Sequence, residues 1–239
     1  MNLFNGDCLE LMADIPDGSI DMVLADPPYG TTQCKWDSII PLDEMWKQLK
    51  RVTKPSGAIV LMGQGMFTAR LQTSSPFYRY SLIYEKGKAG GFLNARRMPL
   101  QAHEDITIHY QKLPVYNPQM TIGKPYSKKN ISNGDGGNYG KFERVGKTCL
   151  SDGERFPRSV LKFSNPNKNS LHPTQKPVAL MEYLIKTYTN EGDTVLDFCM
   201  GSGTTGVAAQ NLNRKFYGIE KYKTYFDIAC KRIEETIYR

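Results

Sequence analysis

The pattern of apolar and polar positions along the chain predicts an α/β fold. Short apolar runs at Ile20–Ala25, Ala58–Met62 and Thr194–Leu196 are bounded by turn residues, as is typical of strands buried within a sheet. Apolar residues recur every three or four positions over Leu42–Val52 and from Tyr222 to Ile237, which predicts amphipathic helices. Strands and helices that alternate in this way indicate a mixed, mostly parallel sheet with helices on both faces.

Weaker patterns predict the remaining elements. We expect further strands at Leu3–Phe4, Tyr78–Tyr84, Ile106–Tyr110 and Phe216–Glu220, and helices that begin near Cys8, Phe67, Pro177 and Thr204. The segment Asn117–Ser170 is rich in Gly, Asn, Lys and Pro and has little periodicity, so we expect loops there, with a flexible run at Ser132–Asn138.

Length and composition indicate a single globular domain over residues 1–239. Apolar residues make up 40% and charged residues 23%, and no apolar run approaches the roughly 20 residues that span a bilayer. The segment Met1–Asp7 has neither the basic start nor the apolar stretch of a secretory signal. Five scattered cysteines without a Cys-x-x-Cys pair, and three scattered histidines, favour a reducing cytoplasm and no bound metal.

Positive charge is concentrated in the middle of the chain. The net charge is +7, and residues 86–170 hold 15 Lys and Arg against 6 Asp and Glu. Aromatic residues such as Tyr116, Tyr126 and Phe142 are interleaved with these basic side chains, as on surfaces that bind polyanions. We therefore expect 86–170 to be a basic insertion that recognises nucleic acid. The alternative is a solvated loop that only keeps the protein soluble.

The sequence Asp26-Pro27-Pro28-Tyr29 directly follows the first buried strand. Two prolines end the strand and hold the chain extended, which fixes a carboxylate, a free carbonyl and an aromatic ring at one sheet edge. Asp26 and the Pro27 carbonyl can accept both N–H bonds of an exocyclic base amine, and Tyr29 can stack on an extruded base. The alternative interpretation is a Pro-Pro turn that closes an ordinary strand.

A glycine turn, Gly201-Ser202-Gly203, joins a second apolar strand to a helix. Such a turn lets a ligand approach the backbone and the free N–H groups of the helix N-terminus. Glu220 ends the next strand about 20 residues later, where a carboxylate can bind ribose hydroxyls. The two features together predict a site for a nucleoside cofactor, whereas the glycines alone could form only a tight turn.

Three motifs together resemble the β-class of DNA amino methyltransferases, of the phage or restriction-modification type. They are Asp26-Pro-Pro-Tyr29, His172-Pro-Thr-Gln-Lys-Pro177 and Asp197-Phe-Cys-Met-Gly-Ser-Gly203, and the resemblance spans about Leu3 to Ile233. It implies a Rossmann-like fold that uses S-adenosylmethionine and methylates N6 of adenine or N4 of cytosine. Asp26 favours adenine, because the cytosine enzymes more often carry serine there.

The resemblance also implies the partners and the location. Double-stranded DNA would be the substrate, in the cytoplasm of a bacterial cell or a phage-infected host and associated with the nucleoid. The resemblance leaves open whether the chain forms a homodimer and whether it has a cognate restriction endonuclease. A methyltransferase acting on RNA or protein glutamine, or a non-catalytic DNA-binding module, are the rival functions. Intact Asp26, Tyr29 and Glu220 argue against the module.

The resemblance assigns site residues as follows. Catalysis falls on Asp26, Pro27, Pro28 and Tyr29. Cofactor binding falls on Asp7, Cys8, Asp26, His172, Thr174, Gln175, Lys176, Asp197, Phe198, Gly201, Ser202, Gly203, Thr204, Thr205, Glu220 and Lys221. The basic middle supplies Arg96, Arg97, Lys128 and Lys129 as DNA-binding candidates.

The order of the motifs indicates a circular permutation. In a nucleoside-binding sheet, the strand before the glycine turn (the glycine strand, here Thr194–Leu196) normally comes first in the chain, and the strand that ends in the acidic residue (here Phe216–Glu220) comes second. In this chain both lie near the C-terminus, and Leu3–Phe4 would be the third strand. Asp7 would then face the adenine of the cofactor, unless it only caps a helix. Lys176 would pair with the methionine carboxylate of the cofactor. In the alternative interpretation, His172–Pro177 is only the proline-bounded start of a helix that Thr174 caps.

Overall fold

The computed structural model describes residues 1–32, 34, 37–129, 148–164 and 175–237. These divide into two compact units, the first comprising Met1–Asn117 with Ser159–Arg239, and the second Pro118–Arg158. His172, Thr174 and the run Ser132–Asn138 lie outside the described residues. No helix in the described ranges is long and apolar enough to cross a membrane.

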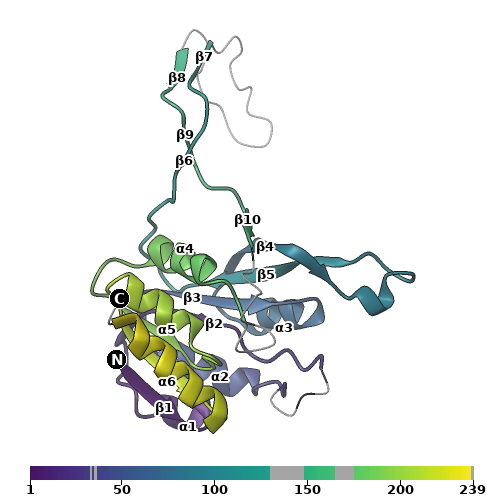
Figure 1. Cartoon of the computed structure of the whole chain (residues 1–239). Helices are drawn as coiled ribbons and strands as arrows, with labels where there is room; N and C mark the ends of the chain where they lie inside the picture. Colours follow the sequence, from purple (N-terminus) through teal and green to yellow (C-terminus); the bar gives the residue numbers. More distant parts are fainter. Residues whose placement is uncertain (33, 35–36, 130–147, 165–174, 238–239) are drawn as a thin grey trace. The chain divides into compact units, whose positions relative to one another are not determined.

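The first unit is built on an eight-stranded sheet in the order β1-β12-β11-β2-β3-β5-β4-β10 (Figure 1). Its strands are β1 (Asn2–Asn5), β2 (Ile20–Ala25), β3 (Thr53–Gly63), β4 (Tyr78–Gly90), β5 (Gln101–His109), β10 (Val160–Phe163), β11 (Thr194–Asp197) and β12 (Lys215–Glu220). In this sheet β5 pairs antiparallel with β3 and β4, and the other neighbours pair in parallel. The expected mixed, mostly parallel sheet is confirmed.

Helices cover both faces of this sheet. The helices are α1 (Cys8–Met12), α2 (Leu42–Val52), α3 (Met66–Ser74), α4 (Val178–Tyr188), α5 (Thr204–Asn211) and α6 (Lys223–Ile237). Alternate residues of β2 point to opposite faces, because side chains alternate along a strand. Met22 and Leu24 therefore pack in the cluster with α4, α5 and α6, whereas Val23 and Ala25 pack in the cluster with α1, α2 and α3.

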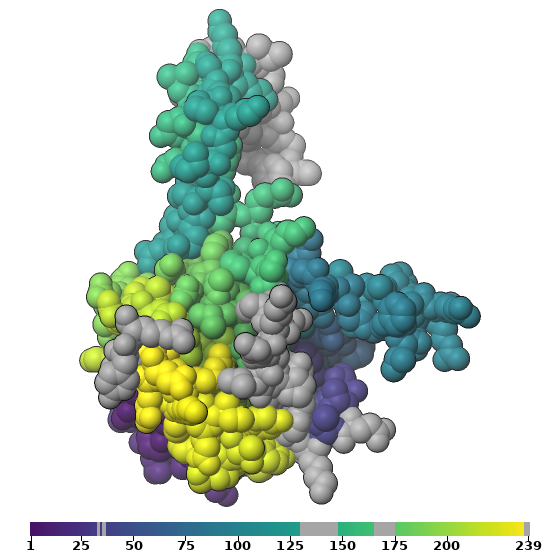
Figure 2. Space-filling view, in the orientation of Figure 1, coloured from purple at the N-terminus to yellow at the C-terminus, as the bar shows by residue number. Residues whose placement is uncertain are grey.

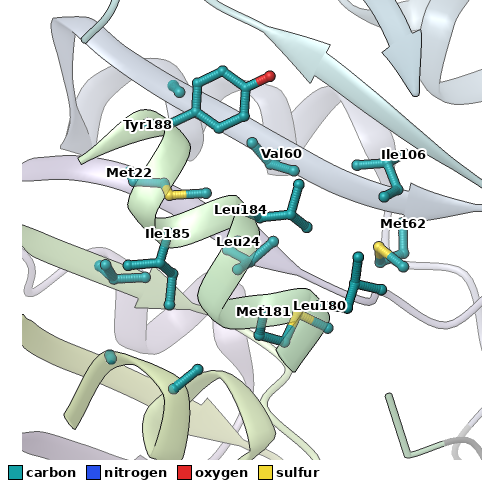
Figure 3. Close-up of a cluster of buried hydrophobic side chains, with 14 of the residues drawn as sticks. Met22, Leu24, Val60, Met62, Ile106, Leu180, Met181, Leu184, Ile185 and Tyr188 are labelled. Atoms are coloured by element: carbon teal, nitrogen blue, oxygen red, sulfur yellow. The ribbon is translucent and has the colours of Figure 1, made fainter. Parts of the chain in front are cut away.

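Helix α4 shows how the core is closed. Leu180, Leu184 and Ile185 are fully buried and face Met22 and Val60 on the sheet (Figure 3). Burying one such side chain contributes about 1.5–3 kcal/mol, so this face of α4 holds the helix against β2 and β3. The adjoining segment, which begins with Gln175 and Lys176, is thereby fixed beside the end of β2.

The strand order confirms the permuted arrangement. β1 pairs with β12, and β12 pairs with β11, so Leu3 and Phe4 lie in the third strand counted from the glycine strand. The carboxyl ends of β1, β12, β11 and β2 consequently meet at one edge of the sheet.

Strands β4 and β5 continue beyond the sheet as a hairpin arm. A short 3-10 helix, η1 (Phe92–Asn94), lies at its tip, and residues 91–100 of the tip are exposed. The arm protrudes from the rest of the first unit (Figures 1 and 2).

The second unit consists of two antiparallel pairs of short strands. β6 (Thr121–Ile122) pairs with β9 (Glu154–Arg155), and β7 (Tyr126–Lys129) pairs with β8 (Thr148–Ser151). The expectation of loops throughout Asn117–Ser170 was wrong for these strands and for β10, because strands of two to four residues are too short to show a periodicity. The compact unit is also narrower than the basic segment 86–170, since β4 and β5 belong to the large sheet.

Candidate active site

A cavity of about 500 Å³ opens at the edge where the four strand ends meet. The residues that follow these strands line it, among them Asp7 after β1, Asp26 after β2, Phe198 after β11 and Glu220 at the end of β12. The volume is in the range of small-molecule sites, and the place is where open α/β sheets bind ligands.

The Asp26 carboxylate is held from two sides. Its Oδ1 accepts a hydrogen bond from the Tyr29 hydroxyl at 2.6 Å, and its Oδ2 accepts one from the Lys176 ammonium at 2.5 Å. The side chain is 24% exposed, so the carboxylate still reaches the cavity. A carboxylate has about four lone-pair sites, which leaves it able to accept further hydrogen bonds from a ligand.

The Tyr29 ring lies over Phe67 from α3, with 5.1 Å between ring centroids. Burial and the neighbouring Asp26 carboxylate raise the pKa of the Tyr29 hydroxyl, so it stays protonated and remains a hydrogen-bond donor. Asp37 fixes the backbone of the residues that follow Tyr29. Its carboxylate accepts hydrogen bonds from the backbone N–H groups of Gly30, Thr31 and Thr32 at 2.6–2.9 Å.

Lys176 is buried between two carboxylates. Its Nζ lies 2.5 Å from Asp26 Oδ2 and 3.1 Å from Glu104 Oε2, and its side chain is 7% exposed. Burial would lower the pKa of Lys176, but the Asp26 and Glu104 charges outweigh burial and raise it. The lysine is therefore charged, and it connects β5 to the end of β2.

The Glu220 carboxylate organises the glycine turn. Its Oε2 accepts from the Gly201 N–H at 2.9 Å and its Oε1 from the Tyr222 N–H at 2.8 Å. The residue is 7% exposed, and burial raises the pKa of its carboxyl group. Arg232 of α6 secures the other side of the turn by donating to the Ser202 hydroxyl at 2.9 Å.

Gly203 is required by the close packing of α6. Its φ is +78°, and an added Cβ would lie 2.9 Å from the Ala229 side chain. A larger residue would displace the helix that carries Arg232, so this glycine shapes the turn without lining the cavity.

Asp7 caps a helix, which is one of the two roles considered for it from the sequence, while its place beside the adenine of the cofactor stays a prediction. Its Oδ1 accepts from the Leu9 N–H at 3.0 Å and caps α1, and its Oδ2 pairs with Lys221 at 3.0 Å. Asp7 and Lys221 also line the cavity.

Asp197 is enclosed at the foot of the turn. Burial raises the pKa of Asp197 to about 7, and its Oδ1 accepts from the Cys199 N–H at 3.1 Å. Cys8 of α1 is also buried, which raises its thiol pKa to about 12 and keeps it unreactive.

Comparisons with known proteins show the family to which the chain belongs. A family model described as DNA methylase, of the N6 and N4 type, matches residues 20–231. The chain belongs to the N6/N4 DNA methylase family. Type II methyltransferase M.BglII from Bacillus subtilis is 31% identical to this chain in an alignment 254 residues long. The alignment covers 95% of this chain and 67% of that protein.

Solved structures of DNA methylases share the fold. M1.HpyAVI in complex with SAM is 27% identical with a TM-score of 0.67, and the match covers 97% of this chain and 98% of that one. PvuII DNA methyltransferase, a cytosine-N4-specific enzyme, matches 99% of this chain and 91% of that one with a TM-score of 0.70, but at 17% identity it shows the fold alone. The Rossmann-like methyltransferase fold and the family resemblance expected from the motifs are thereby confirmed, as is S-adenosylmethionine as the cofactor of the family.

The cavity of this methylase suits a nucleoside cofactor with a charged tail. Glu220 and Asp7 supply acceptors, and Lys176 and Lys221 supply cations. The buried Tyr84 hydroxyl also lines the cavity and has no hydrogen-bond partner within the described part of the chain, so a ligand could satisfy it. These donors and acceptors fit S-adenosylmethionine.

The other predicted residues of the methylase fall into three groups. Pro27, Pro28, Gln175, Phe198, Ser202, Thr204 and Thr205 line the cavity together with the residues above. Arg96 and Arg97 lie at the exposed tip of the hairpin arm, and Lys128 and Lys129 lie on β7 of the second unit. His172 and Thr174 fall outside the described residues, so their assignments stay predictions.

Sequence reasoning missed several residues of the methylase site. Glu104, Lys86 and Tyr84 come from β4 and β5, which were expected only as strands. Asp37 lies in a polar loop, eleven positions after Asp26. The predicted strand Ile106–Tyr110 begins two positions after Glu104, so a charged residue just before a predicted strand is the one signal that could have indicated it.

Proposed function

We propose that this methylase transfers a methyl group from S-adenosylmethionine to the N6 amino group of adenine, in a base extruded from double-stranded DNA. The observation that carries the proposal is the position of Asp26, which lies in the same cavity as the glycine turn and Glu220. A cofactor held at the turn and an amine held at Asp26 would therefore meet within one enclosed space.

Asp26 and Pro27 would hold the target amine. An exocyclic amine is a poor nucleophile because its lone pair is delocalised into the base. Hydrogen bonds from its two N–H groups to the Asp26 carboxylate and the Pro27 carbonyl would localise that lone pair and aim it at the methyl group. Asp26 then acts mainly as an acceptor, and proton loss from the amine follows transfer.

The cofactor would lie along the strand ends. S-adenosylmethionine supplies an activated methyl group on a sulfonium, so no metal is needed for the transfer. Glu220 would bind the ribose hydroxyls, and Asp7 would face the adenine, as expected for those strand ends. Pairing of Lys176 with the methionine carboxylate stays a prediction, since the structure already gives this lysine two carboxylate partners.

DNA would contact two basic regions. At the tip of the hairpin arm, Arg96 and Arg97 are exposed beside Phe92 and Leu93, which are 80% and 100% exposed. On β7 of the second unit, Lys128 and Lys129 are exposed as well. Basic side chains next to exposed apolar ones match a surface that meets phosphates and bases. The sequence and the cavity leave a homodimer and a restriction endonuclease partner open.

Cytosine-N4 is the second candidate target. The Asp26 motif favours adenine, and the PvuII enzyme of the same fold is cytosine-N4-specific. DNA from cells that express the chain should be digested to nucleosides and analysed by mass spectrometry, with modification-sensitive sequencing to locate the site. We expect N6-methyladenine. N4-methylcytosine would overturn the choice of base, and DNA without either modification would overturn the proposed function.

A further inference from the structure

Four charged side chains form a row that ends at Asp26. Lys86 Nζ lies 3.3 Å from Glu104 Oε1, Glu104 Oε2 lies 3.1 Å from Lys176 Nζ, and Lys176 Nζ lies 2.5 Å from Asp26 Oδ2. The four side chains are only 7–24% exposed, and all of them line the cavity. Charges of opposite sign alternate along the row, so each buried charge is compensated by its neighbours.

Glu104 is the residue that divides this row. Each of its two carboxylate oxygens faces a different lysine, Oε1 toward Lys86 and Oε2 toward Lys176. Burial would raise the pKa of Glu104, but the two lysines outweigh burial and lower it, so the carboxylate is charged. A glutamine would have the same shape, yet its NH₂ group would point at one of the two ammonium groups, because it offers only one acceptor oxygen.

The ion pair between Glu104 and Lys176 determines how the Lys176 ammonium binds the Asp26 carboxylate. Without the Glu104 charge, Asp26 would be the one carboxylate among the described residues that forms an ion pair with the Lys176 ammonium. With Glu104 in place, the ammonium is shared and bonds to Oδ2 of Asp26, while Oδ1 receives the Tyr29 hydroxyl. The Asp26 side chain is 24% exposed and lines the cavity, so its remaining lone pairs are available to a ligand.

We infer that Glu104 is a positioning residue for methyl transfer, which acts through Lys176 to keep the Asp26 carboxylate oriented toward the target amine. The inference rests on the proposed function. Glu104 lines the cavity, but both of its carboxylate oxygens face lysines, so its effect should be on the transfer step and not on binding.

The test compares three variants by single-turnover methyl transfer at saturating cofactor and DNA. Glu104→Gln removes the charge, Glu104→Asp keeps it on a shorter side chain, and Glu85→Gln removes a carboxylate of β4 that pairs with Lys162 on the surface. We expect Glu104→Gln to slow transfer by at least about tenfold, Glu104→Asp to slow it less, and Glu85→Gln to be unchanged. Dissociation constants for S-adenosylmethionine and DNA should stay within about twofold of the parent, at temperatures well below each variant's Tm.

A second readout uses the protein without ligands. In ¹⁵N-lysine NMR, the buried Lys176 ammonium should give a resonance that shifts in Glu104→Gln and stays in place in Glu85→Gln. A parent-like transfer rate in Glu104→Gln, a loss explained by weaker cofactor or DNA binding, or an equal loss in Glu104→Asp would each overturn the inference. A parent protein that methylates no DNA would instead overturn the proposed function.

Discussion

Replacing Glu220 with alanine tests the cofactor half of the site. The Glu220 carboxylate holds the backbone N–H groups of Gly201 and Tyr222, and it faces the cavity where we place the ribose. The substitution therefore removes a ligand contact and loosens the turn that shapes the pocket. Glu220→Gln is a milder version, because its amide oxygen can still accept one of the two bonds.

The size of each effect follows from these contacts. Losing the ribose contact should weaken S-adenosylmethionine binding by at least about tenfold, or about 1.4 kcal/mol. A hydrogen bond to a charged group contributes roughly 1.5–3 kcal/mol, so losing two should also lower the free energy of unfolding by about 3 kcal/mol or more. Glu220→Gln should lie between the parent and Glu220→Ala in both quantities.

Isothermal calorimetry with S-adenosylmethionine and urea unfolding measure the two effects separately. Glu191→Ala is a matched control for cofactor binding, because Glu191 is exposed and precedes β11 at the end opposite the cavity. It should leave the cofactor affinity unchanged and lower the free energy of unfolding less than Glu220→Ala does, since it loses only an exposed hydrogen bond from the Asn213 side chain. If folded Glu220→Ala binds the cofactor with parent affinity, Glu220 does not belong to the cofactor site.

Three further predictions follow from individual contacts. Tyr29→Phe loses the hydrogen bond to Asp26 and should slow single-turnover transfer by roughly fivefold or more, and a parent rate would assign Tyr29 to stacking alone. Replacing Lys128 and Lys129 with alanine should weaken DNA binding and flatten its salt dependence by roughly one unit of slope per lost phosphate contact, whereas an unaltered slope would show that they are only solvated. Burial lowers the pKa of His109 to about 3, so below about pH 6.5 only the unfolded chain binds that proton. Between about pH 6.5 and 3, urea unfolding should show the parent losing about 1.4 kcal/mol per pH unit relative to His109→Phe, and parallel pH curves would contradict this.

Most strands and helices of the first unit could be predicted from the sequence, and two of them with their boundaries. β2 and α2 have the predicted limits because a buried strand and an amphipathic helix each leave a local pattern. The permuted order of the strands was also predictable, because the glycine turn and Glu220 mark the first two strands of the usual order and both lie near the C-terminus. The short strands of the second unit were not, because their residues are mostly exposed and no buried face imposes a pattern.

The electrostatics of the site could not be predicted from the sequence. Lys176 was expected to bind the cofactor, yet its partners Asp26 and Glu104 lie 150 and 72 positions away and approach only through the sheet order. Glu220 was expected to face ribose, and its hydrogen bond from the Gly201 N–H of the glycine turn depends on how β11 and β12 pair. Local patterns locate a side chain on a strand end, but pairing between distant strands decides what it contacts.

In the proposed reaction, Asp26 holds the amine that receives the methyl group. The most direct measurement is mass spectrometry of nucleosides from DNA incubated with S-adenosylmethionine and either the parent protein or Asp26→Ala, with cofactor and DNA affinities measured in parallel. We predict N6-methyladenine with the parent, none above background with Asp26→Ala, and similar affinities for both. Methylation by Asp26→Ala at a rate near that of the parent would contradict the account.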